Sequence, residues 1–268
     1  RQRQMCIRDR KGTTYNNLKG VDTVSENNYS KVYTTTGLAQ NDLLVGLRGT
    51  TDTSGKSSGY LGGVAGFNTV NGTISRAATG KWFVYGDNTT EESKIGGMIG
   101  MNEATGEVKL LVNCAAVRRF TRTDRKNDDD TTHRKIEKIA YVGGVIGVQQ
   151  NTTNDKWVIS ECVNLGTVFD SGSNYIGGII ASWLKNGGTI EKSFNFGSLS
   201  TNTNYGDGSG TVGGIVGFFD QPTPGGTANI LSCQNHGDIL SCGNWEGDKK
   251  HGANDVAGIL GKVVMADG

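Results

Sequence analysis

The chain has 268 residues, including 42 glycines and only 2 prolines, and its formal net charge is +1. Without the first ten residues, which carry four Arg and one Asp, the net charge is −2, which provides no basic surface for binding nucleic acid. No apolar run approaches the roughly 20 residues of a membrane-spanning helix, and the abundance of Gly, Asn, Thr and Ser is typical of a turn-rich all-β protein.

The N-terminal region differs from the rest of the chain. Residues 1–10, RQRQMCIRDR, match the translation of an adapter used in transposase-made sequencing libraries, so we expect them to be an artefact. Residues 11–58 match the later repeats poorly, and we expect a degenerate repeat or an N-terminal cap there. The segment LLVGLRG, residues 43–49, is either a divergent copy of the repeated phrase or part of this cap.

One phrase recurs six times between residues 60 and 262. Its copies are YLGGVAGF (from Tyr60), KIGGMIGM (from Lys94), YVGGVIGV (from Tyr141), YIGGIIAS (from Tyr175), TVGGIVGF (from Thr211) and DVAGILGK (from Asp255). Successive copies start 34, 47, 34, 36 and 44 residues apart, which indicates a unit of about 34 residues with insertions in two intervals. We therefore expect residues 59–268 to form a stack of repeats, truncated after the sixth copy, with an open edge that associates or frays.

Each unit has a second half with its own pattern. It reads CVNLGTV at residues 162–168, SFNFGSL at 193–199 and CQNHGDI at 233–239, and a short run of β-forming residues precedes it. Every unit thus offers two or three short strands separated by turns, with no amphipathic helix. The sequence predicts an all-β fold, a parallel β-solenoid of about six repeats of roughly 34 residues.

Together, these two patterns resemble the GLUG motif of bacterial surface proteins. The resemblance rests on GVAG, GMIG, GVIG, GIVG and GILG and on the trailing Cys/Ser-x-Asn-x-Gly half, and it covers about Tyr60 to Lys262. The fourth copy departs from the motif, because Ala181 replaces the final glycine. The resemblance implies a secreted or cell-surface location in bacteria, within large multidomain proteins such as adhesins and immunoglobulin A metallopeptidases. The motif is not known as a catalytic unit.

Strand alternation predicts which residues of the phrase face the interior. In the third copy the inward set is Val142, Gly144, Ile146 and Val148, and the outward set is Gly143, Val145 and Gly147. Stacked in register, the outward aliphatic residues form a stripe: Val64, Met98, Val145, Ile179, Ile215 and Ile259. Either the chain's own loops cover this stripe, or a partner segment or neighbouring domain docks on it.

Cysteine and asparagine recur at fixed repeat positions. Cys162, Ser193 and Cys233 share one position, and we expect Cys114 to join them in a core ladder of small residues. Two repeats separate Cys162 from Cys233, about 9.6 Å by strand spacing, which is too far for a disulfide. A bridge from Cys233 to Cys242 is sterically allowed.

The repeated asparagines Asn164, Asn195 and Asn235 occupy another shared position. We expect their amides to hydrogen-bond from unit to unit. The alternative is a row of asparagines that binds a glycan. None of the three histidines has metal-ligand spacing, and His236 occupies a variable turn position.

The insertion at residues 118–138 carries eight basic and five acidic residues. Such a mixed run is typical of a solvated loop. As a candidate binding loop it could meet an acidic glycan or protein surface through Arg118, Arg119, Arg134 and Lys135.

These features favour a non-catalytic structural or binding module over an enzyme. The expected partners are a host or environmental protein or glycan and neighbouring domains of the same full-length protein, and we expect no cofactor, no metal, no nucleic acid and no membrane span in this chain. One alternative is the stalk of a secreted zinc metallopeptidase whose catalytic domain lies outside this chain. The other is a β-helix polysaccharide-active enzyme, which needs acidic and basic side chains from neighbouring strands on one sheet face.

Overall fold

The computed structural model describes the chain in segments: residues 44–48, 59–87, 93–120, 140–150, 157–170, 175–184, 187–203, 210–221, 228–243, 245–246, 249–250 and 255–265. The chain divides into two compact units, Arg1–Leu44 and Val45–Gly268. Apart from Leu44, the described residues belong to the second unit. Their regular structure is entirely β, with no helix in these segments.

Four parallel sheets collect the equivalent strands of successive repeats. Sheet A contains β1 (Leu44–Arg48), β5 (Phe83–Asp87), β9 (Ala116–Phe120), β14 (Val168–Asp170), β19 (Leu199–Thr203) and β24 (Ile239–Gly243). Sheet B contains β2 (Gly59–Gly62), β6 (Ser93–Gly96), β10 (Ala140–Gly143), β15 (Tyr175–Gly177), β20 (Thr211–Gly213) and β27 (Asp255–Ala257). These two sheets pack face to face in one half of the repeat.

Sheets C and D pack face to face in the other half. Sheet C contains β3 (Ala65–Asn68), β7 (Ile99–Asn102), β11 (Ile146–Gln150), β16 (Ile180–Leu184), β21 (Val216–Gln221) and β28 (Leu260–Met265). Sheet D contains β4 (Ser75–Ala78), β8 (Glu107–Asn113), β12 (Val158–Ser160), β13 (Val163–Asn164), β17 (Thr189–Glu191), β18 (Phe194–Asn195), β22 (Asn229–Leu231) and β23 (Gln234–Asn235). A separate antiparallel ribbon, β25 (Trp245–Glu246) with β26 (Lys249–Lys250), lies within the last insertion.

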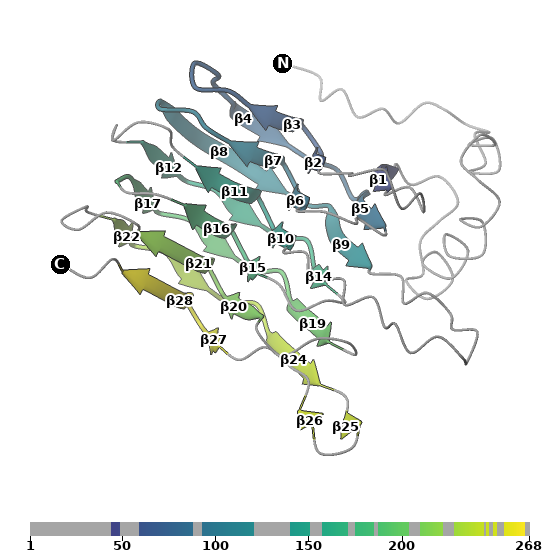
Figure 1. Cartoon of the computed structure of the whole chain (residues 1–268). Helices are drawn as coiled ribbons and strands as arrows, with labels where there is room; N and C mark the ends of the chain where they lie inside the picture. The colour runs from purple at the N-terminus through teal and green to yellow at the C-terminus, as the bar shows by residue number, and fades with distance from the viewer. Residues whose placement is uncertain are drawn as a thin grey trace, which may run out of the picture. The chain divides into compact units, whose positions relative to one another are not determined.

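Within each repeat the chain visits the sheets in the order B, C, D and A, and Figure 1 shows the equivalent strands β7, β11, β16, β21 and β28 lying side by side. We number the repeats from one to six by their sheet B strands, β2, β6, β10, β15, β20 and β27. Identical repeat positions pair: Val142 pairs with Ile95 on one side and with Ile176 on the other. The predicted all-β architecture with parallel, in-register strands is confirmed, and it is consistent with a β-helix-like solenoid.

The repeat contains more strands than the sequence pattern indicated. Two or three were expected, and the structure has one in each of the four sheets, with most sheet D strands divided in two. The segment at residues 43–49 supplies β1, which lies at the edge of sheet A beside β5, whereas the repeated phrase occupies sheets B and C. The aliphatic residue that closes each second half, such as Val168, begins the additional strand of sheet A.

Two apolar clusters fill the interior. The larger packs sheet C against sheet D and includes Ile146, Ile180, Trp183, Trp157 and Ile159. The second packs sheet B against sheet A and includes Ile95, Val142, Ile176, Val117 and Val168. All ten side chains are at most 1% exposed, so the core is continuous along both sides of the repeats.

The double glycine of each phrase forms a corner between sheets B and C. In the third repeat, the backbone N–H groups of Val145 and Ile146 both donate to the carbonyl oxygen of Ile179, at 3.1 and 2.8 Å. The register is the same on both sides of the corner, because Gly143 pairs with Gly177 and Ile146 pairs with Ile180, so one carbonyl accepts two N–H groups without an inserted residue. The same double donation recurs at the corners that start at Val64, Met98, Ile179 and Ile215. Side-chain alternation restarts after each corner.

A second bend divides the sheet D strands. All five non-glycine residues with positive φ in the described segments stack at one repeat position, with φ between 47° and 56°: Arg76, Leu110, Glu161, Lys192 and Ser232. The left-handed residue allows Ile159 and Cys162, three positions apart, to face the same core cluster. Such a conformation costs an L-residue roughly 1–2 kcal/mol.

Glycine at one of these bends should stabilise the protein, because it adopts positive φ without that cost. We expect Ser232→Gly, at an exposed position, to raise the free energy of unfolding by about 0.5–1 kcal/mol. Asn229→Gly, an exposed strand position in the same repeat, is the control and should lower it by about 0.5–1 kcal/mol. Thermal unfolding followed by circular dichroism measures both changes, and equal losses in the two variants would contradict the strain argument.

Candidate docking surface

The predicted outward stripe does not lie on the surface. Four of its members, Met98, Val145, Ile179 and Ile215, are 0% exposed and belong to the cluster between sheets C and D. Only Val64 and Ile259, in the first and last repeats, are exposed, at 45% and 37%. The prediction of an accessible stripe along the repeats is therefore wrong. It assumed unbroken alternation, whereas the bend at the corner turns both residues after the double glycine inward.

An amide ladder supports the opposite corner, between sheets D and A. Asn113 Nδ2 donates to Asn164 Oδ1 at 2.8 Å, and Asn164 Nδ2 donates to Asn195 Oδ1 at 2.7 Å. Asn195 Nδ2 donates in turn to Asn235 Oδ1 at 2.7 Å. The predicted stacking is confirmed, and Asn113 extends it by one repeat. In the first repeat the Thr79 hydroxyl takes the place of the amide and donates to Asn113 Oδ1 at 2.7 Å.

Each ladder amide also closes its own turn. Asn164 Nδ2 donates to the Gly166 carbonyl at 2.9 Å, and the Gly166 N–H donates back to Asn164 Oδ1 at 3.2 Å. Asn164 and Asn195 are 0% exposed, so the alternative of a glycan-binding row of asparagines is wrong for these two residues. The asparagine amides instead fix the backbone of each turn, and the residue that follows each asparagine points outward.

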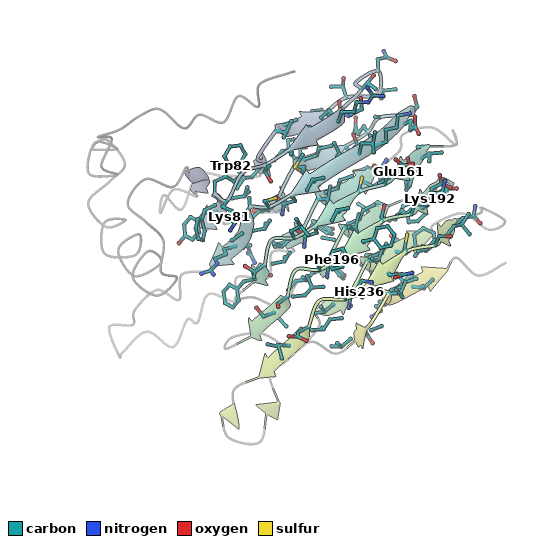
Figure 2. The ribbon with its side chains drawn as sticks, turned by 180° about the vertical axis from the view of Figure 1, so that it is seen from behind. Lys81, Trp82, Glu161, Lys192, Phe196 and His236 are labelled. Atoms are coloured by element: carbon teal, nitrogen blue, oxygen red, sulfur yellow. The ribbon has the colours of Figure 1, made fainter. Side chains whose placement is uncertain are left out.

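That next position carries an exposed apolar ladder on the outside of the turns. Leu165 and Phe196 are each 50% exposed, and His236 continues the ladder in the fifth repeat. The rings of Phe196 and His236 stack with centroids 4.9 Å apart and an interplanar angle of 8°, and Figure 2 shows them lying next to each other. The sequence pattern placed His236 correctly in a variable turn position, but it gave no sign that this position faces solvent as a row.

Two neighbouring ladders complete the surface. Val163, Phe194 and Gln234 lie two residues earlier, and the Phe194 and Phe196 rings stack with centroids 6.4 Å apart. Glu161 and Lys192 occupy the left-handed bend and are both exposed (Figure 2). We call this surface of sheet D the docking face, and its residues are Glu161, Val163, Leu165, Lys192, Phe194, Phe196, Gln234 and His236.

The charged residues of the docking face are only loosely compensated within the chain. Lys192 Nζ lies 3.8 Å from Glu191 Oε1, and the Lys192 side chain is 59% exposed. Glu161 forms no ion pair with any other described residue, although Lys192 lies beside it in the neighbouring strand segment. The face therefore presents one acidic and one basic side chain next to an apolar patch.

The candidate binding loop begins inside the fold. Arg118 and Arg119 belong to β9, and Arg119 is 1% exposed, with its Nη1 3.2 Å from Asp170 Oδ1. The prediction that Arg119 contacts a ligand is wrong, because the strand continues through it and turns it inward to pair with the neighbouring repeat. Arg134 and Lys135 lie outside the described residues.

Arg118 points to the other side of β9 and is half-buried. Its guanidinium carbon lies 5.4 Å from the centroid of the Phe83 ring, a cation–π arrangement. Burial lowers the pKa of Arg118, which still remains charged at neutral pH. The charged guanidinium group of Arg118 therefore packs against the Phe83 ring of the preceding repeat.

The thiols occupy two different repeat positions. Val112 pairs with Val163, so Leu111 is the equivalent of Cys162, whereas Cys114 is the equivalent of Leu165. The prediction that Cys114 joins the Cys162, Ser193 and Cys233 ladder is wrong. Cys233 is a free thiol, so the bridge to Cys242 is not formed.

Cys162 should be unreactive in the folded protein. It is 0% exposed, and burial raises its pKa from 9.0 to about 12 because the thiolate loses its hydration. At pH 9.5 we expect iodoacetamide to modify the half-buried Cys114 at least tenfold faster than Cys162. Mass spectrometry of tryptic peptides measures the two rates of alkylation, and equal rates under native conditions would contradict the burial.

The raised pKa of Cys162 also affects stability. Because the folded-state pKa is raised, the contribution of Cys162 to stability is lost as pH rises from about 9 toward 12.

No metal or membrane feature emerges within the described segments. No group of three or more His, Cys, Asp or Glu side chains there could hold a metal ion. The same residues include no helix long and apolar enough to cross a membrane. Comparisons of the chain with protein-family models, with curated proteins and with solved structures found no match.

Proposed function

We propose that the chain is a non-catalytic structural and binding module, built as a parallel β-solenoid of about six repeats of roughly 34 residues. The parallel in-register strands, the asparagine ladder and the repeated glycine corners support this architecture. Stacked repeats of this kind present side chains at constant spacing on a stiff surface. The module spaces neighbouring domains and offers a surface to a partner.

One observation carries the binding role. The docking face exposes half of Leu165 and half of Phe196 directly above a fully buried hydrogen-bonded ladder. Exposed apolar and aromatic side chains that gather on a rigid support are typical of contact sites. The partner is a host or environmental protein or glycan, or another protein surface that fits this face.

The sequence resemblance to the GLUG motif supports a cellular location for the module. It favours a bacterial cell-surface or secreted protein, with this chain as one region of a longer polypeptide. In that setting the module serves either an adhesin or, as an alternative, the stalk of a secreted zinc metallopeptidase.

A polysaccharide-active enzyme is a second candidate, because an ion pair within one strand of sheet D meets a hydroxyl group from the neighbouring repeat. Lys109 and Glu107 form an ion pair, and Ser160 Oγ donates to Glu107 Oε1 at 3.3 Å. Lys109 lowers the pKa of Glu107, which suits a base better than a proton donor. If this site is catalytic, Glu107→Gln should abolish the release of reducing sugar from a panel of defined polysaccharides.

A binding array tests the main proposal. Defined oligosaccharides, purified extracellular-matrix proteins and the chain itself are immobilised, and the labelled protein is applied. We expect binding to at least one class of spot, reduced at least tenfold by Phe196→Ser and unchanged by Val263→Ser. Val263 is the control because it is an exposed apolar residue on sheet C, 43% exposed, away from the docking face. No binding to any spot, or equal binding by both variants, would overturn the proposal.

A further inference from the structure

We propose that the partner of the docking face is a second copy of this chain, bound through a two-fold axis parallel to the sheet D strands and midway between the third and fourth repeats. This inference rests on the proposed binding role of the face. In such a dimer each repeat position faces the same position of the partner, while the order of the repeats is reversed. The third repeat then faces the fourth repeat of the second copy.

The apolar residues match under this operation. Leu165 faces the partner's Phe196, and Val163 faces the partner's Phe194, each pair occurring twice. One repeat further out, Cys114 faces the partner's His236. In each of these pairs the two residues share one repeat position, because Val112, Val163, Phe194 and Gln234 are successive register partners. A smaller aliphatic side chain thus meets an aromatic ring in both central pairs, which avoids a clash of two large rings.

The charges match as well. Glu161 faces the partner's Lys192, and Lys192 faces the partner's Glu161, so both exposed charges gain an opposite neighbour. Self-docking through an axis along the repeats, perpendicular to the strands, would instead leave the repeats in the same order and would not pair these two residues. Opposite-charge pairs fix the register of an interface, whereas like charges face to face are unfavourable. Charge complementarity therefore selects the second copy as occupant and selects its orientation.

The size of the face sets the expected affinity. The outward-facing row continues beyond the docking face into sheet A, because Thr167 is exposed and Phe169 is half-buried, whereas Gly166 and Val168 are buried. From Glu161 to Phe169 this row is at most about 26 Å long, and four repeats make it about 19 Å wide, or at most about 500 Å² on each copy. The total of about 1,000 Å² lies near the lower limit for a specific interface. We therefore expect a weak dimer, with a dissociation constant in the micromolar range.

Sedimentation equilibrium of the full chain tests the dimer. The monomer mass is 28.4 kDa, and we expect the wild type to approach twice that mass at high micromolar concentration. Glu161→Lys and Lys192→Glu should each weaken dimerisation about tenfold, because each creates two like-charge pairs across the axis. The double variant Glu161→Lys with Lys192→Glu should restore it, because the pairs are again opposite in sign. Loss of dimer in both single variants with recovery in the double variant supports the orientation.

Three results would overturn the inference: a wild type that stays monomeric up to high micromolar concentration, a dimer insensitive to both single variants, or open-ended oligomers, which indicate association through the ends of the stack. The binding array separates these failures from failure of the proposed function. Binding only to oligosaccharide or matrix-protein spots refutes the dimer and keeps the binding module, whereas no binding to any spot refutes both. Far-UV circular dichroism of each variant checks that it folds.

Discussion

Gly144→Ala should destabilise the protein by about 3–5 kcal/mol, whereas the equivalent change in the last repeat, Gly258→Ala, should have almost no effect. A Cβ atom on Gly144 would lie 2.5 Å from both Cγ and Nδ2 of Asn164 and would also contact the Gly178 carbonyl oxygen. A Cβ atom on Gly258 meets nothing within 4 Å. The two glycines share one repeat position, so the comparison isolates the contacts with the asparagine ladder and with the carbonyl oxygen of the next repeat.

The loss of stability expected for Gly144→Ala is large because the neighbouring Asn164 amide cannot move without losing hydrogen bonds. Asn164 is fully buried and hydrogen-bonded to both neighbouring asparagines, so the new methyl group must either displace the amide or open the corner. Either response breaks buried hydrogen bonds, each of which leaves a group whose desolvation costs about 1–3 kcal/mol. Urea unfolding of the two variants and the wild type measures the difference. A Gly144→Ala variant as stable as Gly258→Ala would show that the corner yields without cost.

The same contact explains which part of the repeat could be predicted from the sequence. The repeat length and the strand register could be predicted from the recurring phrases, because parallel stacking places identical repeat positions beside each other. The asparagine ladder followed for the same reason: a repeated side chain that can both donate and accept satisfies itself between repeats. The buried partners of the glycines could not be predicted, since no pattern within the phrase shows that the second glycine faces Asn164 from another sheet.

The direction of the side chains was predicted wrongly where the backbone is irregular. Val145 and Ile146 both face the core because their N–H groups share one acceptor, and counting by two along the chain does not detect that bend. Arg119 was assigned to a loop because the charged run continues beyond it, although its carboxylate partner, Asp170, is a register neighbour in the next repeat. The exposed row of Leu165, Phe196 and His236 was missed because its members differ chemically and share only their position.

Asn164→Leu should lower the free energy of unfolding by about 4 kcal/mol, the second large effect. The change leaves one N–H of Asn113 without its acceptor, and it leaves both backbone groups of Gly166 without their side-chain partners. Asn195 Oδ1 also loses its donor from Asn164, although the Gly197 N–H still donates to it at 3.2 Å. Leucine has the same branched heavy-atom skeleton as asparagine, but its two methyl groups supply neither a donor nor an acceptor.

Asn235→Leu is the matched control, because Asn235 is only partly buried and has an asparagine partner on one side alone. We expect it to cost about 1–2 kcal/mol. The central variant should also divide the stack, since stability in repeat proteins depends on contacts between neighbours. Hydrogen exchange should then accelerate in β13 and β18 of Asn164→Leu, while in Asn235→Leu faster exchange should be confined to β18 and β23. Equal costs in both variants, with exchange unchanged in β13, would show that the amide ladder contributes little and that apolar packing alone holds the repeats together.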